Sequence, residues 1–328
     1  MEFGLQIANM EPRKFRDVAQ SAEGLGFDVL FFPDHIVNEG PERQVDPRAL
    51  SFDHLAMAAL VAEATSKIRI GHLVLCNLFR HPAITAQSLM TLDHISGGRL
   101  IAGLGSGWTE TEFQMTGIPF PPIAERLRML DEALTIIKSL WTNERTTFDG
   151  EFYKLRDAIL WPKPLQERVP IILGGGGRGL LRIAAKHADI LNVISPAGKL
   201  GKISLGNVKR MNDEVFSEAI RFTHDEARKY GRRPDSIRIS NALFVVNITE
   251  SREATRKTVE MMAPMFGLTP EAAAHMPMAL IGTPEECVVE LNRRAKAWGV
   301  SQFIFSGGVG GDEPQLRLIK EQIAAYVK

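Results

Sequence analysis

Short apolar runs alternate with longer amphipathic segments along the whole chain. The apolar runs are nearly continuous, which is the pattern of parallel strands that are buried on both faces. They predict strands over 3–8, 27–32, 68–75, 99–102, 170–173, 190–194, 236–246 and 302–305. Between them, apolar residues at helical spacing predict helices over 12–25, 52–65, 82–95, 123–141, 179–187, 213–230, 252–262, 284–298 and 316–327.

Eight strand–helix units predict an α/β fold of the (β/α)8 TIM-barrel type with inserted loops, in a single domain over 1–328. The segment 143–169 interrupts the alternation, and its Asp149–Gly150 pair predicts a small hairpin. A doubly wound open sheet is the alternative architecture. The first strand–helix turn, 9–12, lacks the GxGxxG sequence of a dinucleotide-binding turn, and this favours the barrel.

The charges of the chain are balanced. Lys plus Arg and Asp plus Glu number 39 each, so the net charge of zero gives no support to a nucleic-acid or membrane-surface partner. We see no signal-peptide pattern at the N-terminus and no apolar stretch long enough to span a bilayer. Cys76 and Cys287 lie far apart and outside any CxxC pattern, which argues against a zinc site or a disulfide framework. We therefore expect a cytoplasmic protein that acts on a small molecule.

The sequence RLIAGLGSGW over 99–108 is the first candidate for ligand contact. Gly103, Gly105 and Gly107 alternate with larger residues, so one side of this segment carries no side chains. A flat ligand or a neighbouring backbone can approach that side closely. The acids Glu110 and Glu112 follow, at the expected start of a helix, where carboxylates are favourable. An ordinary glycine-rich loop is the alternative interpretation.

In a (β/α)8 barrel the chemistry takes place at the carboxyl ends of the strands. Asp34 and His35 follow the second predicted strand, and a carboxylate beside an imidazole can orient the ring and tune its proton. His35 is therefore a candidate for ligand contact, with a structural histidine as the alternative. Cys76 follows the third strand. We interpret it as a small hydrophobic residue of a ring-binding pocket, because no sequence neighbour favours the reactive thiolate.

Two glycine clusters are candidates for a phosphate site. Gly174–Gly177 and Arg178 lie between a strand and a helix, where backbone N–H groups, the helix dipole and a cation favour an anion. The cluster 307–311 runs into Asp312 and Glu313, whose charges would oppose a phosphate. The first cluster is therefore the better candidate, and a plain tight turn is the alternative.

These segments are similar to a known family. The chain resembles the luciferase-like flavin monooxygenase superfamily and, within it, the deazaflavin (coenzyme F420)-dependent oxidoreductases. The resemblance covers nearly the whole chain and is most specific in FRHPAITAQSLMTLDHISGGRLIAGLGSGW and VPIILGGGGRGLLRIAAKHADILNV, with weaker matches in GFDVLFFPDH, FPPIAERLRMLDEAL and IGTPEECVVELNRRAKAWGVSQFIF. It implies a TIM barrel, which agrees with the strand count.

The resemblance also implies roles for individual residues. His35 would lie at the reactive face of the cofactor, and 72–77 would form a bulge, often with a non-proline cis peptide, behind the tricyclic ring. Gly107 and Trp108 would border the ring, and the glycine run would hold the phosphate. The implied catalytic residue is His35, and the implied cofactor-binding residues are His35, His72, Leu73, Leu75, Cys76, Asn77, Gly107, Trp108, Gly174, Gly175, Gly176, Gly177 and Arg178.

The expected activity is hydride transfer between C5 of coenzyme F420 and a small organic substrate. The likeness in GSGWTETEF favours F420 over FMN. An FMN-dependent monooxygenase and a flavin-binding barrel without turnover are the alternatives. Some sugar-phosphate dehydrogenases of the family have a catalytic glutamate where this chain has Trp108, so their mechanism is not expected here. Glu110 or Glu112 would replace that glutamate, or they are charges at a helix start.

A basic loop is the candidate contact for the acidic oligoglutamate tail of F420. Its cations are Lys199, Lys202, Lys209 and Arg210. The alternative is a solvated surface loop. The sequence leaves the assembly open, with a homodimer as one form it allows.

Overall fold

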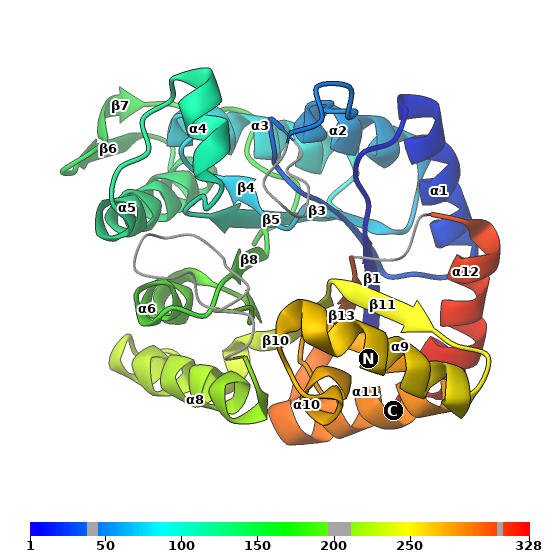
Figure 1. Cartoon of the computed structure of the whole chain (residues 1–328). Coiled ribbons are helices and arrows are strands. Elements are labelled where there is room, and N and C mark those ends of the chain that lie inside the picture. Colours follow the sequence, from blue (N-terminus) through cyan, green and yellow to red (C-terminus); the bar gives the residue numbers. More distant parts are fainter. Residues whose placement is uncertain (38–44, 196–210, 307–310) are drawn as a thin grey trace.

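The computed structural model describes residues 1–37, 45–195, 211–306 and 311–328, and a closed barrel of parallel strands forms its centre (Figure 1). The strands that close it are, in spatial order, β1 Glu2–Gln6, β2 Val29–Phe32, β3 Arg69–His72, β5 Leu100–Gly105, β8 Ile171–Gly174, β9 Ile190–Asn192, β10 Arg238–Leu243 and β13 Val300–Phe305. β13 pairs in parallel with β1, with Phe3 opposite Phe303, so the ring closes. The predicted (β/α)8 TIM barrel is confirmed.

Each barrel strand sends alternate side chains inward and outward. In β2, Val29 and Phe31 belong to the cluster that fills the barrel, whereas Leu30 and Phe32 belong to the layer between barrel and helices. Because both sides of such a strand are buried, its sequence is apolar throughout. This is why the strands could be found as continuous apolar runs.

The helices lie outside the barrel (Figure 1), and neighbouring helices in the ring pack against each other. Their bounds are α1 Pro12–Gly24, α2 His54–Ala64, α3 Pro82–Ile95, α4 Glu110–Thr116, α5 Ile123–Thr142, α6 Arg178–His187, α8 Asp213–Lys229, α9 Arg252–Phe266, α10 Pro270–Ala274, α11 Pro284–Trp298 and α12 Glu313–Leu318. None of the helices within the described ranges is long and apolar enough to cross a membrane.

Strong end signals explain the best boundary predictions. At α11, Thr283 and Glu286 form a reciprocal capping box, and Pro284 occupies the first turn, where its missing N–H costs nothing. Gly299 ends the helix in the left-handed conformation with φ of 66°. The prediction of a helix over 284–298 is therefore confirmed to the residue.

Several predicted elements needed correction, and two elements were missed. The apolar run 236–246 is two strands, because β11 Val245–Ile248 leaves the barrel and pairs with β12 Ala279–Gly282. β12 and the short helix α10 were not predicted. The predicted helix over 316–327 is three elements in the structure. The α-helix α12 ends at Leu318, and a π-helical turn and a 3₁₀ turn follow it. The predicted hairpin is confirmed as β6 Thr146–Asp149 and β7 Lys154–Ala158.

The third barrel strand is broken into β3 and β4, Leu75–Cys76. Gly71 lies opposite Ile101 of β5 and Leu75 lies opposite Leu104, so four steps along one strand face three along the other. The extra residue makes a bulge. The Leu73–Val74 peptide within it is cis, as the family resemblance implied.

Candidate functional site

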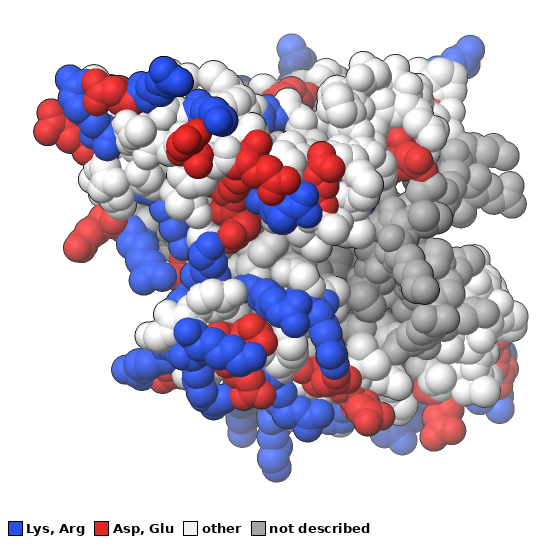
Figure 2. All heavy atoms as spheres, turned by 90° about the vertical axis from the view of Figure 1, so that its left-hand side faces the viewer, with Lys and Arg blue, Asp and Glu red and all other residues white. Residues whose placement is uncertain are grey.

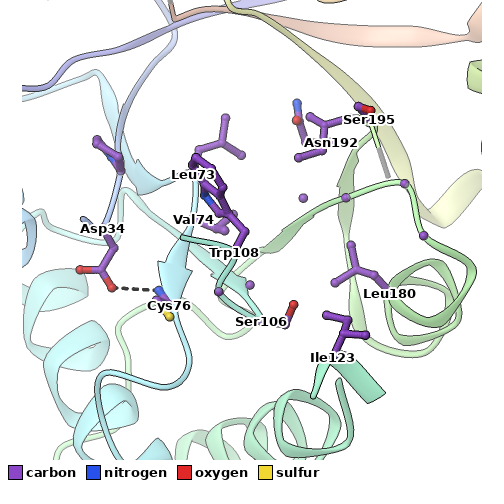
Figure 3. A pocket seen from close by; sticks show the side chains of 18 of the residues that line it. Asp34, Leu73, Val74, Cys76, Ser106, Trp108, Ile123, Leu180, Asn192 and Ser195 are labelled. Atoms are coloured by element: carbon purple, nitrogen blue, oxygen red, sulfur yellow. Dashed lines mark hydrogen bonds between the residues drawn. The ribbon is translucent and has the colours of Figure 1, made fainter. Parts of the chain in front are cut away.

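A cavity of about 380 Å³ lies at the carboxyl ends of the barrel strands (Figure 3). This is the end of a (β/α)8 barrel at which active sites are built, and the size suits an organic ligand. Its wall comes from the segments that follow β2, β5, β8 and β9, from the bulge, and from α5 and α6. The described lining residues are Gln6, Pro33, Asp34, His35, Leu73, Val74, Cys76, Gly105, Ser106, Gly107, Trp108, Glu112, Ile123, Leu127, Gly174, Gly175, Gly176, Gly177, Gly179, Leu180, Asn192, Ile194, Ser195 and Phe244.

The alternating glycines of β5 make room for the bulge. A Cβ on Gly103 would lie 1.6 Å from the His72 carbonyl oxygen, and one on Gly105 would lie 2.5 Å from Cγ2 of Val74. At Gly107, which has φ of +76°, a Cβ would lie 2.9 Å from Sγ of Cys76. The sequence predicted that a flat ligand or a neighbouring backbone would approach these glycines. The structure shows the approach of the neighbouring backbone, that of the bulge. Its result is an apolar ledge, with Leu73 and Val74 on the cavity wall (Figure 3).

Asp34 fixes the far end of this ledge. Its carboxylate accepts the Cys76 backbone N–H at 2.8 Å (Figure 3) and two N–H groups of Arg80 at 2.7 and 3.1 Å. The predicted pairing of Asp34 with His35 is wrong. Both carboxylate oxygens are taken by the backbone and by Arg80, and no hydrogen bond joins Asp34 to the His35 ring within the described part of the chain.

The partner of His35 is Glu112 of α4, 77 residues away. Its carboxylate lies 3.1 Å from Nδ1 of His35 and accepts the backbone N–H groups of Ile36 at 2.6 Å and Val37 at 3.3 Å. Glu112 is buried, and the His35 side chain is 27% exposed at the cavity. A carboxylate that only accepts hydrogen bonds keeps the proton on Nδ1. Nε2 is then the atom left to exchange a proton with a ligand.

Trp108 completes this end of the cavity. Its ring packs edge-on against His35, with centroids 5.6 Å apart, and 39% of the residue is exposed. Cys76 behind it is buried, and burial raises the pKa of its thiol to about 12. The thiol is therefore neutral, in agreement with the predicted role as a small hydrophobic residue.

The opposite end of the cavity is suited to an anion. Gly174–Gly177 run into the first turn of α6, whose first-turn N–H groups have no intrahelical partner and which carries no acidic residue there. A Cβ on Gly177 would meet nothing within 4 Å, so space is open beside it. Ser195 lines the same cavity, and its hydroxyl is buried without a hydrogen-bond partner among the described residues. Figure 3 shows Ser195 and Leu180 across the cavity from Leu73 and Val74.

Nine of the thirteen predicted cofactor-binding positions line the cavity, and four lie behind or beside it. His72 is fully buried in the helix layer, where burial lowers its pKa to about 4, and Leu75 is buried in β4. Asn77 donates to the Tyr153 hydroxyl at 3.2 Å. Arg178 points to solvent and pairs with Glu218 at 3.0 Å. These four side chains do not reach the cavity wall, whereas Glu112, Ser195 and Gln6 do and were not predicted as binding residues.

Two sequence candidates cannot be compared with the structure. The basic loop with Lys199, Lys202, Lys209 and Arg210 lies outside the described residues, and so do Gly307, Gly308 and Gly310 of the second glycine cluster. The face that carries α5, α6 and α8 shows basic and acidic side chains close together (Figure 2). Many are paired there, as Lys186 is with Asp131 at 2.9 Å and Arg128 with Glu151 at 3.0 Å.

Comparison with known proteins gives one consistent family. The family model described as luciferase-like monooxygenase matches residues 2–302. An F420-dependent glucose-6-phosphate dehydrogenase of Intrasporangium calvum is 33% identical over 262 residues, 76% of each chain. One of Kineococcus radiotolerans is 34% identical over 230 residues, 66% of each chain.

Solved structures agree on the fold. The coenzyme F420-dependent tetrahydromethanopterin reductase from Methanopyrus kandleri has a TM-score of 0.77 at 22% identity, covering 100% of this chain and 99% of that one. EDTA monooxygenase from Chelativorans has a TM-score of 0.80 at 13% identity, covering 100% and 93%. Both cover the barrel from its first strand to its last, so the whole described chain follows this architecture.

Proposed function

The chain belongs to the luciferase-like monooxygenase family, and from this premise we propose that it is an F420-dependent oxidoreductase. It transfers a hydride between C5 of the deazaflavin and a carbonyl or alcohol carbon of a small organic substrate. The observation that carries the proposal is a single cavity with an apolar ledge, a held histidine and an anion-binding end. The names of the relatives, F420-dependent glucose-6-phosphate dehydrogenases, support the choice of cofactor.

The residues of the cavity suit the two parts of such a cofactor. Leu73 and Val74 offer a flat apolar surface to one face of a tricyclic ring, and Gly107 lines the same cavity. The N–H groups at the start of α6 and the unpartnered Ser195 hydroxyl suit a phosphate. FMN has a ring and a phosphate too, so these contacts serve either cofactor.

When bound, the cofactor supplies or accepts the hydride. His35 supplies the matching proton. A hydride that reaches a carbonyl carbon leaves negative charge on the oxygen, and Nε2 of protonated His35 neutralises it by donating a proton. In the reverse direction neutral Nε2 accepts the hydroxyl proton. Glu112 holds the ring by Nδ1 in both directions, and Trp108 limits its rotation from the side.

We do not propose glucose 6-phosphate as the substrate, although the relatives are named for it. Trp108 occupies the position at which the resemblance implies the catalytic glutamate of sugar-phosphate dehydrogenases. Glu112 is engaged with His35 and two backbone N–H groups. The proposal is therefore limited to a neutral carbonyl or alcohol function.

Affinity for the two cofactors tests the proposal directly. F420 and FMN are titrated separately into the purified protein, and their dissociation constants are read from the absorbance of the ring. We expect F420 to bind more tightly. Tight FMN binding with weak F420 binding would instead support an FMN-dependent monooxygenase, in keeping with the family name. Binding of neither would support a barrel without turnover.

Three broader features complete the proposal. The pairing of β1 with β13 supports one catalytic domain over 1–328. Two free, buried cysteines suit a reducing cytoplasm. A homodimer is the proposed assembly, and light scattering of the purified protein tests it.

A further inference from the structure

Among the residues that the structure describes, two arginines are completely buried, and they differ in how their charge is satisfied. Arg294 bonds Glu290 at 2.7 Å and the carbonyl oxygens of Met276, Pro277 and Ala279. Arg126, near the start of α5, has no carboxylate partner within the ranges that the structure describes, and its Nε and Nη2 atoms have no hydrogen-bond partner there. Its guanidinium lies 3.9 Å above the Phe120 ring. A buried cation without a carboxylate partner is costly.

The contact that Arg126 does make is with the cavity wall. Nη1 donates to the Gly107 carbonyl oxygen at 2.6 Å and lies 3.5 Å from the Ser106 carbonyl oxygen. Ser106, Gly107 and Trp108 line the cavity, whereas Arg126 does not. Arg126 therefore holds this loop from behind, and its charge lies one residue layer from the cavity.

The direction of these carbonyl groups fixes the direction of the next amides. In a trans peptide the C=O and N–H bonds point to opposite sides. With the carbonyls of Ser106 and Gly107 turned toward Arg126, the N–H groups of Gly107 and Trp108 point away from Arg126, and both residues line the cavity. Neither N–H has a partner among the described residues. Two successive free amides, the first on a residue with φ of +76°, form a concave donor site of the kind that binds anions.

We propose that the backbone amides of Gly107 and Trp108, backed by the charge of Arg126, form a binding site for a negatively charged oxygen in the cavity. The inference rests on the proposed function for what brings that oxygen. One source is a carbonyl oxygen of the bound ring, which gains charge when the ring is reduced. The other is the oxygen of the substrate as hydride arrives at its carbon. Donors aimed at developing charge are the usual way to stabilise it.

The Trp108 amide can be observed alone. Gly107–Trp108 is the one Gly–Trp sequence among the 4 tryptophans of the chain, so labelling glycine carbonyls with ¹³C and tryptophan amides with ¹⁵N gives one HNCO signal. The wild-type protein is titrated first with oxidised F420, then with reduced F420, then with oxidised F420 plus acetone. A downfield shift with cofactor alone that grows on reduction assigns the ring oxygen. A shift only with acetone assigns the substrate oxygen.

An unmoved signal in all three titrations, with F420 bound by its own absorbance, refutes the inference and leaves the proposed function intact. If F420 does not bind, the proposed function fails. The HNCO titration is then repeated with FMN, which has the same ring carbonyls. An unmoved signal there refutes the inference as well.

Variants of Arg126 test the role of its charge. Arg126→Met removes the charge, Arg126→Lys keeps it, and Arg128→Gln changes an exposed charge on the same helix. If the ring oxygen is bound, the ratio of the dissociation constants for reduced and oxidised F420 rises at least tenfold in Arg126→Met alone. If the substrate oxygen is bound, kcat falls at least tenfold there with both affinities unchanged. Equal losses in the Met and Lys variants, with lowered Tm, would assign Arg126 a purely structural role and overturn the proposal. If the Met variant does not fold, the HNCO titration of the wild type decides alone.

Discussion

Replacing Glu112 by glutamine tests how His35 is held. The carboxylate accepts from Nδ1 of His35, so Nε2 faces the cavity without a proton when the ring is neutral. In Glu112→Gln the side-chain oxygen still accepts the Ile36 and Val37 N–H groups, because the 2.6 Å bond to Ile36 fixes its place. The amide NH2 then takes the place of the oxygen that lies 3.1 Å from Nδ1 and faces Nδ1 as a donor, while the remaining oxygen, 3.2 Å from Nδ1, is already engaged with the two backbone N–H groups. The proton of the neutral His35 ring then moves to Nε2. Nε2 can no longer accept a proton from the ligand, so the ring is in the wrong tautomer.

The structure sets different magnitudes for stability and activity. Stability changes little, since the shape is kept and one charged hydrogen bond becomes a neutral one, a loss of about 1–2 kcal/mol. Activity changes more. General acid–base help is worth roughly 10²–10⁴-fold, and a wrong tautomer removes most of it. We therefore expect kcat to fall by about 10²-fold or more while Tm falls by a few degrees.

The assay is a single-turnover measurement with the cofactor already bound, which separates the chemical step from binding. Glu112→Gln is compared with His35→Ala, with the double variant, and with Glu110→Gln two residues earlier on α4. If Glu112 acts through His35, the double variant is no slower than His35→Ala. Glu110→Gln keeps wild-type kcat, because Glu110 does not line the cavity.

Two results would refute this reasoning. An unchanged kcat in Glu112→Gln would mean that the tautomer of His35 does not matter to the reaction. Losses that multiply in the double variant would mean that Glu112 acts on the ligand independently of His35, as a catalytic residue rather than a positioning one.

Four further outcomes follow from single residues. Ser195→Ala weakens F420 binding about tenfold but leaves Tm unchanged, because its hydroxyl has no partner in the described protein; titration and thermal unfolding check both. Gly176→Asp weakens binding by roughly 30- to 1,000-fold through repulsion of the phosphate, whereas Gly24→Asp, with open space around it, leaves the dissociation constant as it was. Gly103→Ala lowers the free energy of unfolding in urea by about 3 kcal/mol, since the new Cβ would lie 1.6 Å from the His72 carbonyl oxygen; Gly24→Ala changes it by less than about 1 kcal/mol. The free energy of unfolding falls by about 3 kcal/mol as the pH drops from 6.5 to about 4. Burial lowers the pKa of His72 to about 4, so over this range the unfolded chain binds a proton at His72 and the folded chain does not. The other buried histidines add to this slope, and His72→Gln makes it shallower; an unchanged slope contradicts the assignment.

The sequence predicted the barrel because the signals for it are local. A strand buried on both faces, such as Val29–Phe32, is apolar at every position, and helix ends such as Thr283–Glu286 carry their own caps. The run 236–246 was misjudged because β10 and β11 are separated by a single residue, Phe244, at which the chain leaves one sheet for another. An apolar residue at that position carries no turn signal.

The site was predictable only where sequence neighbours are also spatial neighbours. The glycine run before α6 could be placed at the cavity because the loop and the helix start are one continuous segment. Asp34 was assigned to His35 because they are adjacent, yet successive side chains of an extended segment point in opposite directions. The true partner, Glu112, comes from α4 and could not be found by spacing. Ser195 lacked any signal, since a serine after a strand is ordinary until its hydroxyl is found buried and unpaired.

The two ends of the cavity are built by different parts of the barrel, and this separates binding from chemistry. The anion end depends on β8, β9 and the start of α6, whereas the proton-transfer end depends on β2, α4 and the loop after β5. The ledge of Leu73 and Val74 joins them, because the glycines of β5 let the bulge come close enough to support a ring between the two. Damage at the anion end should therefore raise the dissociation constant and spare kcat, and damage at Glu112 should do the reverse. A change that displaces the ledge, such as Gly103→Ala, should affect both the dissociation constant and kcat, because the ledge bears on where the ring lies relative to His35.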